Sequence, residues 1–326
     1  MLKKLFLFTC FLFVVTMSAQ YEISIEAELK PETKSIQINQ QIVFKNTSNI
    51  AWQDVFLNDW ANSFSSKTTP LAKRFAENYN SSFHFEKKED RGKTTVHSIT
   101  GATNTPLNWK RGKAADIIKI TPINPILPGE NFTLNLMYTV KLPSTKFTRF
   151  GVTENNNYKL KYWYISPAVF DNDWQAYSNK NTDDLFLTPS SFTISFKVPK
   201  EYKLTSDFNI ISETISENQK TILLQGKERN QATLFLEKDS SFETIETDKL
   251  TIVTNLKDEK ISPQISALAI DRIVHFLDDN LGEYPFKKMV ISEADYRNSP
   301  VYGLNQLPDF ISPFPAGFEY DMEQLK

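Results

Sequence analysis

The stretch IQINQQIVF at residues 36–44 sets the pattern that recurs through most of this chain. Ile36, Ile38, Ile42 and Phe44 occupy alternate positions, and mostly polar residues stand between them. Successive side chains of a strand point to opposite faces, so a period of two indicates a strand with one buried face. Residues 36–44 therefore predict a half-buried strand.

The same alternation returns along the chain as far as about residue 247. It occurs at residues 132–140 and 192–198, and in shorter form at 221–224, 232–236 and 250–253. Polar turns separate these runs, and a short helix is expected only within residues 65–80. Regular strands without a long helix predict a mainly β fold, an antiparallel β-sandwich or saddle, for residues 20–247.

The pattern changes in residues 248–326, where one strand is followed by a helical period. Ser262 can cap a helix whose first turn holds Pro263, and Gly282 supplies a left-handed stop. One face of this helix collects apolar residues, namely Ile265, Leu268, Ala269, Ile273, Phe276 and Leu277. A further strand is expected at 288–292. So small an α+β segment cannot bury its own apolar faces, so we expect an incomplete domain that continues beyond Lys326.

Residues 1–19 have the composition of a signal peptide. Two lysines precede an apolar run at 5–15, and Ser18 and Ala19 are small residues suited to cleavage before Gln20. The apolar run is shorter than the roughly 20 residues of a membrane-spanning helix. Cleavage is favoured over a retained anchor. The sequence thus predicts export to the periplasm or the extracellular space, with no membrane span afterwards.

Composition excludes several classes of site. The single cysteine, Cys10, lies in the predicted signal peptide, so the mature chain can form neither a disulfide nor a cysteine metal site. Loss of Lys3 and Lys4 leaves 35 basic against 39 acidic residues, a net charge of about −4. That balance argues against nucleic acid as a partner, which would favour a basic surface.

Three stretches carry a resemblance to a known family. They are YEISI at 21–25, paired with IVFKN at 42–46, then WYISP at 163–167, and above all GEYPFKK at 282–288 after the predicted helix. In this order they resemble the aminopeptidase-N type of gluzincin zinc metallopeptidases. The resemblance implies a β-saddle domain followed by the start of a thermolysin-like catalytic domain.

In that family a Gly-x-Met-Glu-Asn loop follows, whose Glu binds the amino group of a peptide and whose backbone lies along it as an extra strand. Residues 300–308 match this loop, but its Glu position falls at Leu304 or Gln306, which carry no charge. The resemblance implies that the following residues line a peptide groove: Tyr302, Gly303, Leu304, Asn305 and Gln306. A structural edge strand with a glycine bulge explains the loop equally well.

The resemblance also implies a zinc site of the H-E-x-x-H type, in which one helix face carries both histidines. This chain has only His84, His97 and His275, and none of them lies four residues from another. His84 and His97 occur in alternating, strand-like sequence, and His275 lies away from the apolar stripe of its helix. We therefore expect no cofactor in this chain, and zinc only if sequence beyond Lys326 supplies the motif.

Two functional hypotheses follow. In the first, the chain is the front part of an exported zinc aminopeptidase-like protein that shapes a cleft for a peptide substrate, and it is inactive without a C-terminal catalytic domain. In the second, it is a non-catalytic relative that binds peptides or proteins of the cell envelope.

A weaker third hypothesis is an adhesion or carbohydrate module. Its candidate platform would be formed by Trp163, Tyr164, Phe170 and Trp174, although aromatic residues in a β-rich domain more commonly form the core.

Overall fold

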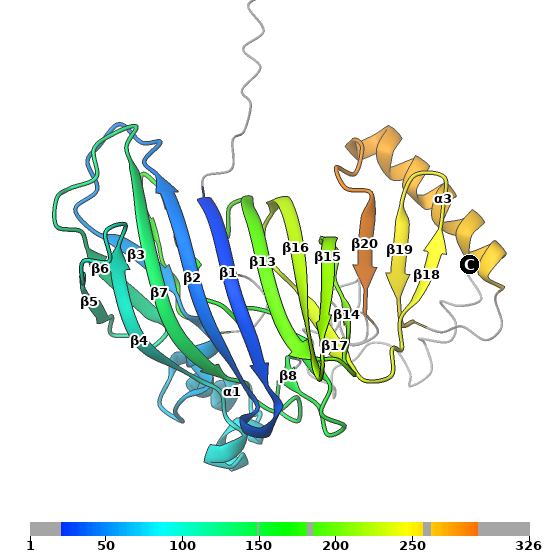
Figure 1. The fold of residues 1–326 in the computed structure, drawn as a ribbon, viewed down its shortest axis with the longest axis horizontal. Coiled ribbons are helices and arrows are strands. Elements are labelled where there is room, and N and C mark those ends of the chain that lie inside the picture. The colour runs from blue at the N-terminus through cyan, green and yellow to red at the C-terminus, as the bar shows by residue number, and fades with distance from the viewer. Residues whose placement is uncertain (1–20, 149, 181–184, 257–261, 293–326) are drawn as a thin grey trace, which may run out of the picture.

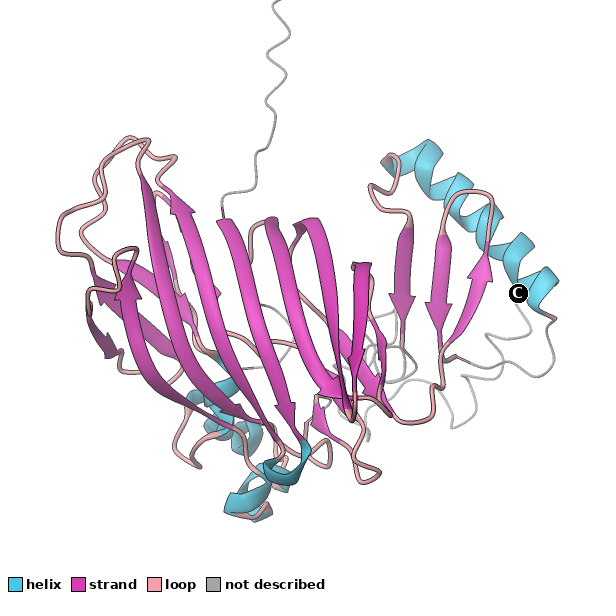
Figure 2. Cartoon of the chain, in the orientation of Figure 1, coloured by secondary structure: helices cyan, strands magenta, loops and turns pink. Residues whose placement is uncertain are grey.

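A computed structural model describes residues 21–148, 150–180, 185–256 and 262–292 of the chain. Within these ranges the protein is mainly β, as the sequence predicts, and most strand pairings are antiparallel (Figures 1 and 2). None of the described helices is long and apolar enough to cross a membrane.

The largest element is a curved seven-stranded sheet (Figure 1). Its spatial order is β15 (Asn209–Ser216), β16 (Gln219–Arg229), β13 (Ser190–Pro199), β1 (Tyr21–Lys30), β2 (Ser35–Lys45), β7 (Asn131–Lys141) and β4 (Lys93–Gly101). Five of the six pairings are antiparallel. The exception is β1 with β13, a parallel pair in which Tyr21 faces Ser190 and Glu28 faces Lys197. The first strand therefore lies in the middle of the sheet.

Apart from the edge strand β15, which is exposed along its whole length, one face of this sheet is buried and the other faces solvent. In β2, Ile36, Ile38, Ile42 and Phe44 are at most 2% exposed, which confirms the predicted half-buried strand. β7 and β13 show the same alternation. Gln40 is a polar residue on this buried face and is only 3% exposed.

Two smaller sheets and a hairpin belong with the same core. The first sheet has the order β10 (Ser166–Pro167), β3 (Val55–Asn58), β6 (Ile117–Thr121) and β5 (Asn108–Arg111). The second has β14 (Lys203–Thr205), β17 (Leu234–Glu237), β9 (Tyr158–Leu160) and β8 (Gly151–Val152). The hairpin pairs β11 (Val169–Asp171) with β12 (Asp173–Gln175). All three contribute to one continuous hydrophobic cluster.

Short helices lie between several strands. They are η1 (Pro31–Thr33), η2 (Trp60–Phe64), α1 (Pro70–Glu77), α2 (Ser82–Phe85) and η3 (Lys88–Asp90). Of these, η2, α1 and α2 contribute to a small second hydrophobic cluster beside the core. The helix predicted within 65–80 is confirmed, and Thr69 caps it by accepting a hydrogen bond from the Ala72 amide. The strand-like environment expected for His84 is wrong: His84 lies in α2, because Phe83 points inward there to join a cluster with Phe64 and other apolar residues.

The remaining described elements form a separate small layer. A three-stranded sheet has the order β18 (Glu243–Glu246), β19 (Thr251–Thr254) and β20 (Lys288–Ile291), and α3 (Pro263–Leu281) lies beside it (Figure 1). The helix begins at the predicted cap and ends before Gly282 as predicted, but the left-handed helical conformation expected for Gly282 is wrong. The Ser262 side chain accepts a hydrogen bond from the Ile265 amide, and Gly282 follows the last turn with φ of 106°. Its ψ of 160° places Gly282 outside the left-handed helical region.

The apolar stripe predicted on α3 is exposed to solvent. Leu268 and Phe276 are 63% and 65% exposed, whereas Val274 on the opposite side is half-buried. The face turned to the sheet is polar at its ends: Asp271 accepts a hydrogen bond from the Asp248 amide, and Asp278 forms an ion pair with Lys249. None of the described residues covers the stripe.

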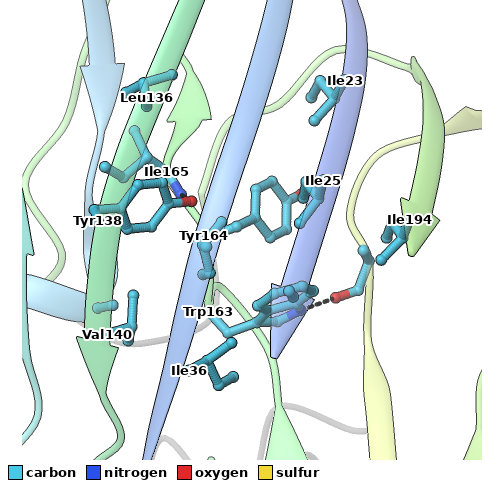
Figure 3. Packing of buried hydrophobic residues seen from close by; sticks show 14 of the residues in the cluster. Ile23, Ile25, Ile36, Leu136, Tyr138, Val140, Trp163, Tyr164, Ile165 and Ile194 are labelled. Carbon is cyan, nitrogen blue, oxygen red and sulfur yellow. Dashed lines mark hydrogen bonds between the residues drawn. The ribbon is translucent and has the colours of Figure 1, made fainter. Parts of the chain in front are cut away.

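A buried polar triad of Tyr138, Gln40 and Ile165 ties the large sheet to the layer that covers it, and Figure 3 shows Tyr138 beside Ile165. The Tyr138 hydroxyl donates to Gln40 Oε1 and accepts from the Ile165 amide at 3.0 Å. Gln40 Nε2 donates to the Ile165 carbonyl oxygen at 2.8 Å. This closed set of hydrogen bonds satisfies Gln40 inside the core.

We predict that Tyr138→Phe lowers the free energy of unfolding by about 1–3 kcal/mol, because the Ile165 amide and Gln40 Oε1 lose a partner where water cannot replace it. Chemical denaturation measures the change. Thr133→Val in the same strand, on the solvent side, is the control and should change stability by less than about 0.5 kcal/mol. Equal effects of the two substitutions would contradict the role assigned to the triad.

Candidate functional site

The residues that the sequence analysis predicts to line a peptide groove lie outside the described ranges. They are Tyr302, Gly303, Leu304, Asn305 and Gln306. Their contribution to a groove therefore stays a prediction. The described residues nearest to them in sequence are those of β20 and the segment that leads into it.

The 163–175 segment divides into a buried part and a surface hairpin. Trp163 and Tyr164 are 1% and 3% exposed, and Trp163 Nε1 donates to the Ala232 carbonyl oxygen at 2.9 Å (Figure 3). Phe170 and Trp174 pack as half-buried rings against Trp52, at 5.1 and 4.9 Å between centroids. Trp163 and Tyr164 therefore belong to the core, and Phe170 and Trp174 pack against it, so the four side chains do not form an exposed platform.

The junction into the small layer is built around Arg229, at the end of β16. Its guanidinium lies 3.4 Å from the ring centroid of Phe286, which belongs to the 282–288 segment that carries the family resemblance. Arg229 also forms an ion pair with Asp207 at 2.9 Å and donates to the Asp207 carbonyl oxygen. Tyr284 packs edge-on against Phe286 at 5.5 Å. One guanidinium thus connects three segments that are far apart in the sequence.

Burial perturbs the charged groups at this junction. It raises the pKa of Asp207, and the charge of Arg229 opposes that rise. Burial also lowers the pKa of Lys288, while the carboxylate of Asp207 acts in the opposite direction. A desolvated cation over an aromatic ring interacts more strongly than an exposed one, so the junction holds the small layer against the β domain. Sequence reasoning found residues 282–288 but missed Arg229 and Asp207, for which no local pattern exists.

A second set of perturbed carboxylates is structural. Asp59 and Asp116 are fully buried, and burial raises the pKa of both. Asp59 accepts from Thr94 Oγ1 at 2.6 Å and pairs with Arg111 at 2.8 Å. Asp116 accepts from the Asn179 amide at 2.7 Å. Because both carboxylates are shielded from solvent and occupied by internal donors, they stabilise the loops rather than face a substrate.

The described residues do not fit a zinc site. His84 lies in α2, His97 in β4 and His275 in α3, and each belongs to a different part of the fold. His97 Nε2 contacts Thr139 Oγ1 at 2.8 Å, and His84 Nε2 contacts the Ala72 carbonyl oxygen at 3.1 Å. Within the described ranges no three His, Cys, Asp or Glu side chains are grouped so as to hold a metal ion.

We predict that Arg229→Lys loosens the small layer, because lysine keeps a charge for Asp207 but loses the planar stacking on Phe286, worth about 1–2 kcal/mol. Hydrogen exchange of the amides at 284–291 should become faster while those of β13 stay unchanged. Arg74→Lys, in an exposed ion pair with Glu77, is the matched control. Unchanged exchange at 284–291 in Arg229→Lys would rule out this role of the junction.

Comparisons with known proteins identify the fold. No protein-family model and no curated protein matches the sequence. Among solved structures, a variant of the M1 zinc metallopeptidase from Deinococcus radiodurans matches with a TM-score of 0.51 and 12% identity, over 84% of this chain and 56% of that chain.

Two related structures match similarly. A two-domain M1 zinc metallopeptidase variant bound to L-arginine has a TM-score of 0.50 and 13% identity, over 84% and 56% of the two chains. The unmodified enzyme from Deinococcus radiodurans has a TM-score of 0.50 and 12% identity, over 84% and 55%. The chain thus spans little more than half the length of these proteins, and at such low identity the likeness concerns the fold. The described residues adopt a fold distantly similar to that of M1 zinc metallopeptidases.

Proposed function

We propose that this chain is the β-rich front part of an exported zinc aminopeptidase-like protein, in which the β domain shapes one wall of a peptide-binding cleft. The single observation that carries the proposal is the likeness to M1 zinc metallopeptidases, which extends over 84% of the chain. Export, to the periplasm or the extracellular space, rests on the composition of residues 1–19.

The small layer supports the same proposal. A helix with a solvent-exposed apolar stripe is expected where further chain completes the layer, because such a stripe is costly to leave in water. The Arg229–Phe286 contact holds β20 and its preceding segment against the β domain. Residues that follow β20 would therefore begin close to the β domain, where Tyr302 to Gln306 are proposed to line the cleft.

Hydrolysis in this proposal depends on residues that the described ranges do not contain. A zinc ion would need an H-E-x-x-H pair and a later Glu beyond Lys326. The contribution of the described residues is to shape the cleft and to position it.

We predict that residues 20–326 alone show no zinc-dependent hydrolysis of aminoacyl substrates. The measurement is release of a fluorogenic leaving group with added zinc and, as a control, with a chelator. Hydrolysis that needs zinc and stops with the chelator would contradict the proposal. Whether a longer protein is an active enzyme is tested by reading the coding sequence past Lys326. An H-E-x-x-H with a later Glu there favours an active enzyme.

A non-catalytic relative that binds peptides or cell-envelope proteins is the alternative. It is favoured because the position of the Glu in the aminopeptidase-N family falls at Leu304 or Gln306 here, and neither side chain is charged. A neutral side chain there forfeits the charge-assisted hydrogen bond to a peptide ammonium group.

Binding of matched peptides with free and with acetylated amino termini separates the two. Preference for the free terminus by about tenfold, the value of one charge-assisted hydrogen bond, favours the aminopeptidase. Equal binding of both peptides favours the non-catalytic relative. Isothermal titration with the full chain measures both affinities.

A further inference from the structure

The solvent face of the seven-stranded sheet carries a hollow that the proposed function does not use. It has a volume of about 470 Å³ and opens to solvent. Six strands contribute the side chains that line it: Glu26 and Glu28 from β1, Gln37 and Asn39 from β2, His97 from β4, Met137 and Thr139 from β7, Ser195 and Lys197 from β13, and Thr221 from β16.

Strand register arranges these groups in two rows that run across the sheet. In the first row Glu26 lies between Asn39 and Ser195, and Met137 continues the row beyond Asn39. Because neighbouring strands lie about 4.8 Å apart, polar groups recur along each row at that interval.

The second row lies beside the first. Glu28 stands between Gln37 and Lys197, and Thr139 and Thr221 extend the row at its two ends. The floor of the hollow is thus a grid of carboxylate, amide, hydroxyl and ammonium groups.

Two members of the grid are held in place by neighbours. The carboxylate of Glu28 contacts the ammonium groups of Lys30 at 2.7 Å and Lys197 at 3.4 Å. Lys30 is the main cause that lowers the pKa of Glu28, so this carboxylate stays charged. His97 is the extra residue of a β-bulge, and its ring contacts the Thr139 hydroxyl at 2.8 Å. Bulges commonly re-aim a side chain toward a functional surface.

Other members are available to a ligand. Among the described residues, no side-chain hydrogen bond or ion pair is formed by Glu26, Gln37 or Asn39, and all three are exposed. Met137 is 50% exposed in the same row and adds an apolar contact surface. The hollow therefore combines fixed groups with free donors and acceptors.

The chemistry of the hollow selects a class of ligand. Backbone groups of these central strands are already used in the sheet, so a ligand is recognised by side chains alone. Glu26 and Glu28 are balanced by Lys30 and Lys197, so neither a polyanion nor a polycation is favoured. A hydroxyl group both donates and accepts, and can satisfy a carboxylate, an amide or an imidazole in turn.

From this combination we propose that the hollow binds a neutral, hydroxyl-rich ligand of the oligosaccharide class. Sugar hydroxyls would bridge adjacent members of the two rows, and the apolar face of a sugar ring would contact Met137. This site shares no residue with the aromatic set Trp163, Tyr164, Phe170 and Trp174 considered in the sequence analysis. This proposal does not depend on the proposed aminopeptidase-like function.

The test titrates the full chain with the neutral tetrasaccharides chitotetraose, maltotetraose and cellotetraose by isothermal titration. At least one is expected to bind saturably. Glu26→Leu should weaken that binding by about tenfold, because it removes a charged acceptor from the first row. Glu22→Leu is the matched control, since Glu22 lies on the same strand and the same face but outside the hollow. It should change affinity less than twofold.

Two results would overturn the proposal. The first is absence of saturable binding of all three tetrasaccharides by the unaltered chain. The second is equal weakening, or none, in Glu26→Leu and Glu22→Leu, which would place binding elsewhere. Because residue 26 is on the solvent face, circular dichroism and the midpoint of thermal unfolding should match those of the unaltered chain, which separates loss of binding from loss of fold. Peptide affinity plays no part in this readout, so failure here leaves the proposed function untouched.

Discussion

The pairing of β1 on both sides is the constraint on which the rest of the β domain depends. β1 pairs antiparallel with β2, its neighbour in sequence, and parallel with β13, whose Ser190 faces Tyr21. A parallel pair needs a long crossover connection, and here residues 31–189 supply it; they contain the β10–β3–β6–β5 sheet, strands β8 and β9 of the other small sheet and the helices α1 and α2. The small-sheet strands of this connection contribute apolar side chains to the same core as the large sheet.

Polar contacts then select one arrangement of that covering layer. Apolar packing alone tolerates sliding between layers, whereas buried hydrogen bonds require a particular partner at a particular place. The Tyr138–Gln40–Ile165 triad supplies such contacts, and the Trp163 indole donates to the Ala232 carbonyl oxygen (Figure 3). The Tyr21 hydroxyl adds a further bond to the Ala168 carbonyl oxygen at 2.8 Å. These bonds place the 163–175 segment against the central strands and orient its hairpin toward the surface.

The small layer of β18, β19, β20 and α3 differs from the β domain, because a few contacts at its border attach it there. The outer stripe of α3 faces solvent, and the layer meets the β domain through Arg229, which combines an ion pair with a stacked aromatic ring. This junction joins the segment before β20 to the end of β16. The polar hollow differs from the apolar stripe of α3. It lies on a solvent face of the large sheet where most side chains carry hydrogen-bond donors and acceptors. Cleft and hollow are therefore separate proposals with separate physical bases.

Local sequence patterns predict where strands and helices occur, but they do not predict which of these elements pack against one another. The alternation at 36–44 and the cap formed by Ser262 predicted β2 and α3, because strand and helix periodicity and capping act within a few residues. The groove residues 302–306 lie outside the described ranges, so the sequence prediction stands there untested. His84 was misplaced in a strand because the side chain that decides its environment, Phe83, packs against residues distant in sequence.

Which strands meet, by contrast, was decided only in the tertiary structure. The parallel pairing of β1 with β13, the burial of Gln40, the Arg229–Phe286 contact and the two rows of the hollow all join residues that no local window contains. The physical reason is that periodicity reports which face of an element is apolar but carries no information on the neighbour that covers it. The sequence by itself determined a chain of half-buried strands followed by an amphipathic helix, and the folded core determined how they are joined.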